Sequence, residues 1–160
     1  MKHAAFAASK ELTALAVRIA VALDKPLSEA APHLARRLKA GNVVLLVDRA
    51  DIPTRKEASY LVSALTHAIC ELWKWDTHKI PRHAEYFQGH LGSPIYSAPV
   101  KEADRALEFI GEAEEWAFDS ERTKDARKKT RCAAARDRWL LDAARKFDLA
   151  AHMLVDWIGE

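Results

Sequence analysis

The part of the chain after Pro99 is almost free of residues that end helices. It contains no further proline, and Gly111 is its only glycine before Gly159. Proline and glycine are the two residue types that most disfavour a helix interior. This stretch therefore predicts two long helices joined by a short turn.

We expect the first of these helices over Lys101–Ala117 and the second from Asp119 to Arg145. The turn is predicted at Phe118–Ser120, whose aspartate or serine would cap the second helix. A last apolar pattern, Phe147 to Ile158, continues this helix, either unbroken or bent near Asp148.

The two predicted helices carry opposite charge. The first contains six carboxylates, at Glu102, Asp104, Glu108, Glu112, Glu114 and Glu115. In the second, six cations fall within about 100° of the helix surface and extend over about 32 Å: Lys124, Arg127, Lys128, Arg131, Arg138 and Arg145. Such a stripe can follow a phosphate backbone. It stays available only if Glu108, Glu112 and Glu115 face away from it and do not neutralise it.

Helical patterns also fill the N-terminal half of the chain. Apolar residues recur at helical spacing from Ala4 to Leu23, and Asp24 and Pro26 end that pattern. Ser28 can start a second helix, which we expect to end at Gly41.

Two further helices are expected before Asp76. The run Val43–Val47 fits a strand or a helix, and we favour a helix because no second strand is available to pair with it. Thr54 and Glu57 form a capping box that starts a strong helix reaching Trp75. Its predicted core face begins at Ala58.

The segment 76–100 is predicted to be a long irregular loop, because it is rich in proline and glycine. It contains His78, His83 and His90 among aromatic and basic side chains. Histidines and carboxylates can bind a metal, yet their spacing here matches no established ligand pattern. The same residues could instead bind a single nucleic-acid strand or pack into the core. We therefore expect no metal and no cofactor.

Composition favours one all-α domain over residues 1–160, a helical bundle of five to seven helices. Apolar residues make up 49% of the chain, enough for a core, and the net charge is only +2, so any nucleic-acid affinity must come from uneven placement of charge. Cys70 and Cys132 are far apart, which is typical of reduced thiols in a cytoplasmic protein. The N-terminal pattern predicts neither a signal peptide nor a membrane span.

Catalytic patterns are few. The chain has no phosphate-binding glycine loop, no nucleophile elbow and no HExxH pair. Arg145 and His152 fit the Arg-x4-6-His spacing of helical ribonuclease domains, but Lys146 follows the arginine where that family usually has a small polar residue. An enzyme is therefore the less favoured alternative. The five tryptophans predict core packing first and an assembly interface second.

Two stretches carry a resemblance to a known family. Lys56–Leu65 is similar to a helix that opens with charged residues before a Leu-Val-x-Ala-Leu run, and Phe147–Trp157 is similar to a terminal leucine-rich helix ending in tryptophan. In these stretches the chain resembles the small all-helical subunit of CRISPR RNA-guided effector complexes. The resemblance implies a non-catalytic subunit of an antiviral ribonucleoprotein, present in more than one copy, that supports RNA and DNA through basic side chains.

These observations predict a non-enzymatic helical subunit that contacts the nucleic-acid backbone, independent of sequence, within a larger assembly. A second basic cluster is formed in the sequence by Arg36, Arg37, Lys39, Arg55 and Lys56. The residues we expect to bind nucleic acid are Lys124, Arg127, Lys128, Arg131, Arg138, Arg36, Arg37, Lys39 and Arg82. The alternatives are a ribonuclease that uses Arg145 and His152, and a protein-binding adaptor that contacts other subunits or itself without nucleic acid.

Overall fold

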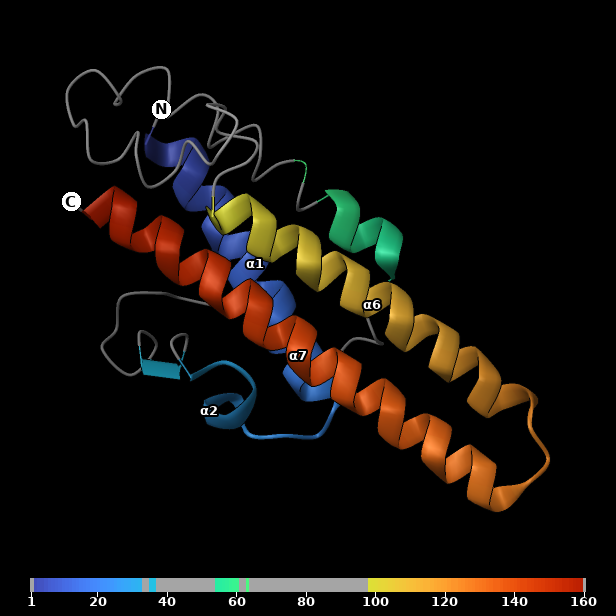
Figure 1. Ribbon diagram of the computed structural model, residues 1–160. Helices are drawn as coiled ribbons and strands as arrows, with labels where there is room; N and C mark the ends of the chain where they lie inside the picture. Colours follow the sequence, from blue (N-terminus) through green and yellow to red (C-terminus); the bar gives the residue numbers. More distant parts are fainter. Residues whose placement is uncertain (1, 33–34, 37–53, 61–62, 64–97, 160) are drawn as a thin grey trace.

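The computed structural model describes residues 2–32, 35–36, 54–60, 63 and 98–159, and these residues form an all-α helical bundle without any strand. The long helices are α1 (Lys2–Ala22), α6 (Ala98–Arg122) and α7 (Ala126–Gly159), and a short helix, α2 (Leu27–Ala30), follows α1. Helix α7 packs against both α6 and α1 (Figure 1). The expected fold class is thus confirmed.

Helix α1 ends in a Schellman motif. The Lys25 N–H donates to the Ala20 carbonyl at 3.2 Å, and the Asp24 N–H donates to the Val21 carbonyl at 3.0 Å. Asp24 adopts the left-handed conformation, with φ at 53°, that this motif requires. The prediction that Asp24 and Pro26 end the first helix is confirmed, and the left-handed residue is the physical reason.

The second helix, α2, starts earlier than predicted and ends much sooner. It begins at Leu27, with Pro26 and not Ser28 at the N-cap, and it is interrupted at Ala31, where φ is −141° and ψ is 75°. Ala31 precedes Pro32, and the ring of a proline disfavours the α conformation in the residue before it. The proline therefore divides the predicted helix at Ala31.

Helices α6 and α7 form the predicted antiparallel hairpin, with different bounds. Helix α6 starts at Ala98, so Pro99 lies in its first turn and is buried there. A proline is tolerated at this position because the N–H groups of a first helical turn have no partner within the helix. Of the two alternatives left open near Asp148, the unbroken helix is the one observed, and α7 runs for 34 residues.

The predicted turn at Phe118–Ser120 is wrong. All three residues lie inside α6, and the connection is Thr123–Asp125. The Thr123 N–H donates to the Asp119 carbonyl at 3.1 Å, which closes one more turn of α6. Ser120 does not cap α7 but donates its hydroxyl to the Lys129 carbonyl, 3.4 Å away across the hairpin.

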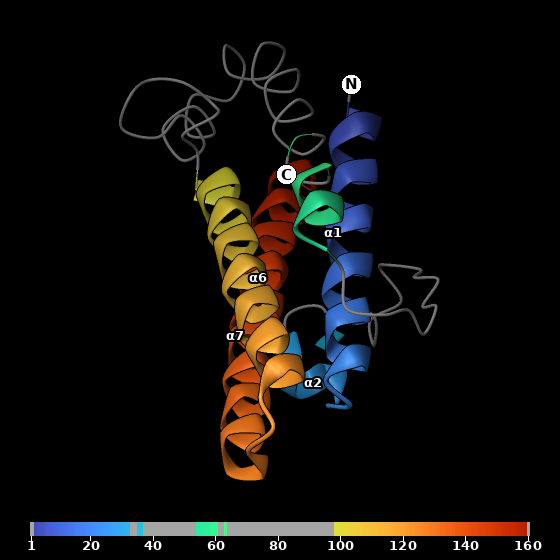
Figure 2. The ribbon, with the colours of Figure 1, turned by 90° about the vertical axis from the view of Figure 1, so that its right-hand side faces the viewer.

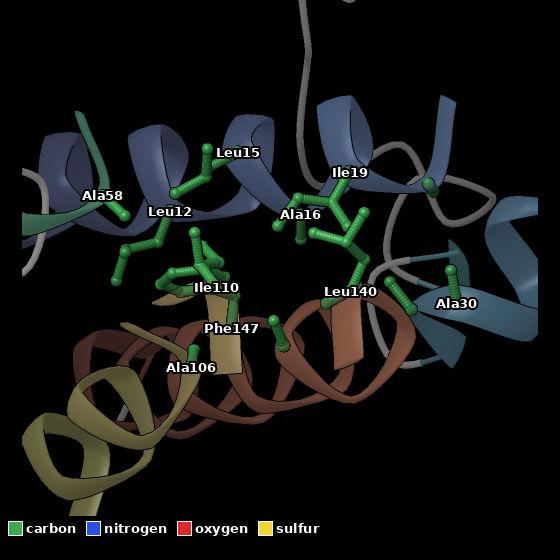
Figure 3. Close-up of a cluster of buried hydrophobic side chains, with 14 of the residues drawn as sticks. Leu12, Leu15, Ala16, Ile19, Ala30, Ala58, Ala106, Ile110, Leu140 and Phe147 are labelled. Carbon is green, nitrogen blue, oxygen red and sulfur yellow. The ribbon is translucent and has the colours of Figure 1, made fainter. Parts of the chain in front are cut away.

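The core lies where α1 meets the hairpin (Figure 3). Its largest fully buried side chains come from all three long helices: Leu12, Leu15 and Ile19 of α1, Ile110 of α6, and Leu140 and Phe147 of α7. Most of the apolar positions predicted in α1 are thus buried, and so are Phe147 and Ala151 of the pattern predicted for the C-terminal part of α7. Burial of these side chains drives the three helices together.

A short helical segment, residues 55–60, bridges α1 and α6 (Figure 2). It begins at the predicted capping box, since the Glu57 N–H donates to Thr54 Oγ1 at 3.2 Å and the Thr54 N–H donates to Glu57 Oε2 at 3.3 Å. Ala58 is fully buried in the core, as predicted. Glu57 also pairs with Arg18 of α1 at 3.5 Å.

Several predictions fall outside the described residues: the helices expected over 43–47 and 64–75, the end of the second helix at Gly41, and the loop up to residue 97. Among the helices that are described, none combines the length and the apolarity needed to cross a membrane. Cys132 is a buried, free thiol.

Candidate nucleic-acid interface

The closed end of the α6–α7 hairpin extends beyond the end of α1 (Figures 1 and 2). From Glu114 to Arg131 no side chain is buried, whereas Ala113 and Cys132 on either side are. We call residues 114–131 the hairpin tip. Its two helical ends contact each other but share no buried side chain with the rest of the bundle.

Positive charge is dense in the second part of this tip, residues 122–131, whereas its α6 arm carries the carboxylates Glu114, Glu115, Asp119 and Glu121. Between residues 122 and 131 the chain has six cations and one carboxylate, Asp125. We call these cations the basic tip, and all six are exposed: Arg122, Lys124, Arg127, Lys128, Lys129 and Arg131. In the described part of the chain, the ion pairs within 4.0 Å include none of the six. Their charges therefore face solvent without a neutralising partner.

The single carboxylate within this stretch caps α7. Asp125 Oδ1 accepts hydrogen bonds from the Arg127 N–H at 2.9 Å and the Lys128 N–H at 3.4 Å. An aspartate at an N-cap satisfies N–H groups that lack a partner within the helix. Asp125 is therefore committed to the backbone. Lys124 lies in the turn before it and not on the helical stripe where the sequence pattern placed it.

An aromatic side chain stands beside the basic tip. Phe118 is 56% exposed. The Arg122 guanidinium lies over its ring at 5.0 Å from the centroid, within cation–π range. More than half of the Phe118 surface is left to solvent beside this contact.

Four arginines share the outer face of α7. At about 100° per residue, Arg127, Arg131, Arg138 and Arg145 fall within about 40° of one another, over about 27 Å of helix. All four are exposed, and we call them the arginine row. Arg127 and Arg131 also line an open depression together with Ala126 and Thr130.

Five carboxylates form a matching row on α6. Within about 80° of its outer face lie Asp104, Glu108, Glu112, Glu115 and Asp119, all of them exposed, and we call them the acidic row. Among the described residues, no ion pair within 4.0 Å joins this row to the arginine row. Within the part of the chain that the structure describes, Glu108, Glu112 and Glu115 therefore form no ion pair with the stripe.

Partial loss of hydration raises the pKa of the Asp104 carboxyl above its ordinary value of 3.8, and the nearby Glu108 carboxylate raises it further. The acidic row therefore carries some unrelieved repulsion.

One half-buried ion pair connects the two helices of the hairpin. Lys146 Nζ lies 2.8 Å from Glu102 Oε2, with exposed fractions of 27% and 17%. A second contact joins Phe109 and Trp139, whose ring centroids are 5.3 Å apart. These contacts identify the sides of α6 and α7 that face each other. They also show which residues of the two helices lie at the same height along the hairpin axis, that is, at the same level.

The second predicted basic cluster is divided. Arg36 is exposed and follows α2, whereas Arg55 and Lys56 are exposed near α6. Ala30 and Ala58, which belong to these two regions, lie at opposite ends of the core (Figure 3). The Arg55 N–H donates to Glu114 Oε1 at 2.6 Å, so this segment is attached to α6. Arg37, Lys39 and Arg82 lie outside the described residues.

The alternative catalytic residues are two turns apart. Arg145 and His152 lie on the same side of α7, with about 10.5 Å of helical rise between them. Arg145 is exposed and lies 3.7 Å from the Asp142 carboxylate. No group of three or more potential metal ligands occurs in the described part of the chain, while His78, His83 and His90 lie outside it.

Three residues of this tip were missed in the sequence: Phe118, Arg122 and Lys129. Phe118 was assigned to the turn. Lys129 lies on the side of the predicted helix that carries its apolar residues, so it was not counted in the basic stripe, but at the tip this side of the helix covers no core. Asp125 followed by Ala126 was the available signal, because an aspartate before a strong helix former also predicts an N-cap.

Comparison of the chain with models of protein families, with curated proteins and with solved structures gave no match.

Proposed function

We propose that this protein is a non-enzymatic helical subunit that binds the nucleic-acid backbone through the basic tip of its α6–α7 hairpin, within a larger assembly. The observation that carries the proposal is the concentration of six exposed cations within residues 122–131, at the protruding end of the hairpin, where the single carboxylate of that stretch caps α7. Lysine and arginine side chains of this kind contact phosphates without reading base sequence.

The exposed ring of Phe118 favours a single strand over a duplex. Bases of a single strand stack on aromatic side chains, and an adjacent arginine adds a cation–π contribution. Phe118 with Arg122 over one face provides this arrangement beside the phosphate-binding cations. The resemblance to CRISPR effector small subunits supports an RNA-containing assembly as the setting.

Fluorescence anisotropy with labelled oligonucleotides across a salt series tests the proposal. Lys128→Gln with Lys129→Gln should lower affinity and reduce the slope of log K against log salt by about one per lost phosphate contact. The matched control is Lys10→Gln with Arg105→Gln, which removes the same charge from exposed sites away from the tip. Absence of binding at low salt, or equal losses in the two double variants, would refute the proposal.

A second measurement tests the preference for a single strand. Phe118→Ala should weaken single-strand binding by about 1–3 kcal/mol, the contribution of one stacked base, and leave duplex binding nearly unchanged. Tyr60→Ala is the control, because Tyr60 is 68% exposed and lies on the 55–60 segment. Equal weakening of single-strand and duplex binding by Phe118→Ala would argue against stacking.

A further inference from the structure

The acidic row and the arginine row lie on one face of the hairpin. On α7, Leu140 and Phe147 point into the core, and the arginine row occupies the opposite side of the helix. On α6, Ile110 points into the core, and the acidic row is again opposite. Both rows therefore face away from α1, side by side along the hairpin.

The rows are also in register. Glu102 and Phe109 of α6 lie level with Lys146 and Trp139 of α7. Counting along the two antiparallel helices from these contacts places three of the four arginines of the arginine row beside or between carboxylates of the acidic row. Asp104 is level with Arg145, Glu108 and Glu112 flank the level of Arg138, and Glu115 and Asp119 flank the level of Arg131.

We propose that two copies of this chain dock face to face through this side of the hairpin, with the acidic row of each copy on the arginine row of the other. A two-fold axis parallel to the helices exchanges the positions of α6 and α7 and keeps every residue at its level. Arg131, Arg138 and Arg145 then meet the carboxylates whose level they share. The alternative two-fold axis, perpendicular to the helices, would place acidic row on acidic row and is opposed by repulsion.

Such a surface is complementary to itself, which is the requirement for an isologous dimer. Exposed ion pairs alone contribute little, but half-buried aromatic rings lie between the two rows. Phe109 and Trp116 follow the acidic row around α6 toward α7, and Trp139 faces them from α7. Docking would cover these rings, as the centre of an interface requires, while the charges fix the orientation.

Some charges on this face compete with docking. Asp142 lies 3.7 Å from Arg145 within the same chain, and Arg105 stands at the edge of the acidic row. The intrachain pair is exposed and therefore weak, so a carboxylate from a second copy can replace it. We expect a salt-sensitive dimer and not an obligate one.

Charge exchange tests the proposal by sedimentation equilibrium on nuclease-treated protein. The wild type should dimerise at 50 mM NaCl and weaken by about tenfold or more at 500 mM, because screening shortens the reach of exposed charges. Glu108→Lys with Glu112→Lys should give a monomer, and Arg138→Glu with Arg145→Glu should also give a monomer. All four side chains are exposed, and circular dichroism would verify that each variant folds.

Mixing the two double variants gives the decisive result. In the mixture each basic face meets an acidic face, so a heterodimer should form although neither variant pairs with itself. A monomeric wild type at low salt, variants that dimerise like the wild type, or a mixture that stays monomeric would each overturn the proposal. Lys128→Gln with Lys129→Gln must still dimerise, which separates this inference from nucleic-acid binding at the tip.

Discussion

Replacing Phe147 by alanine should cost more stability than a substitution anywhere in the hairpin tip. Phe147 is the largest of the fully buried side chains in the described part of the chain, and it lies among Leu12, Ile110 and other core residues (Figure 3). Truncation removes the transfer free energy of the ring and leaves a cavity that the helices can only partly close, at a cost of about 3–5 kcal/mol. With a urea m-value of about 2 kcal/mol/M, the unfolding midpoint should fall by about 2 M.

The chain provides a matched control in Phe118, which is 56% exposed. Phe118→Ala removes the same atoms and one exposed cation–π contact, so its cost should be about 0.5–1 kcal/mol. Urea unfolding of both variants, followed by circular dichroism at fixed pH and salt, gives the comparison. A loss below about 1 kcal/mol for Phe147→Ala, or similar losses for both, would refute the assignment of this core.

Three further substitutions test local features by the same unfolding measurement. Gly111→Ala should stabilise the chain by about 0.5–1 kcal/mol, because the new methyl group would meet Arg55 Cδ at an ordinary 3.6 Å and alanine is the better helix former; a loss of stability would mean that the site is tighter than it is drawn. Asp125→Ala should cost about 1 kcal/mol by removing the N-cap of α7, and Asp125→Asn should recover most of it; equal losses in the two variants would exclude a capping role. The pKa of Asp104 is raised in the folded state, so ionisation of this carboxyl lowers the stability of the fold as the pH rises above 3.8, the ordinary pKa of aspartate. Asp104→Asn should therefore be at least as stable as the wild type at pH 7, and the difference should disappear below pH 4. A destabilised Asp104→Asn at pH 7 would contradict the direction of that shift.

The helices with strong apolar periodicity were predictable, because burial decides their faces. In α1, the spacing of Leu12, Leu15 and Ile19 left no alternative to a helix with one core side, and all three are buried. The capping box at Thr54 and Glu57 was equally predictable, since both of its hydrogen bonds depend on residues only three positions apart.

The ends of the helices were less predictable, because several residues nearby could serve as caps. Asp119, Ser120 and Asp125 are all good N-cap types, and the length of the α6–α7 contact decides among them. The extra turn of α6 comes with the hydroxyl of Ser120 donating to Lys129 of the opposite helix. Such a contact joins elements whose register the sequence does not state.

The charge pattern was predictable as two stripes, but their mutual orientation was not. A helical wheel shows which residues of α7 share a face, and it gives no information about the side on which α6 packs. The pairs Glu102 with Lys146 and Phe109 with Trp139 supply that information. Given these facing sides, the carboxylates of α6 and the arginines of α7 lie on the same outer face of the hairpin.

The absence of buried side chains between Glu114 and Arg131 separates the hairpin tip energetically from the bundle. Helical ends without tertiary packing open at much lower free energy than a core, so amide hydrogens of the tip should exchange well before those near Phe147. The same separation leaves the length of the hairpin free to vary. Adding seven residues to each arm would preserve the facing sides and move the cations about 10.5 Å farther from the core, which would change the reach of the protein without changing its fold.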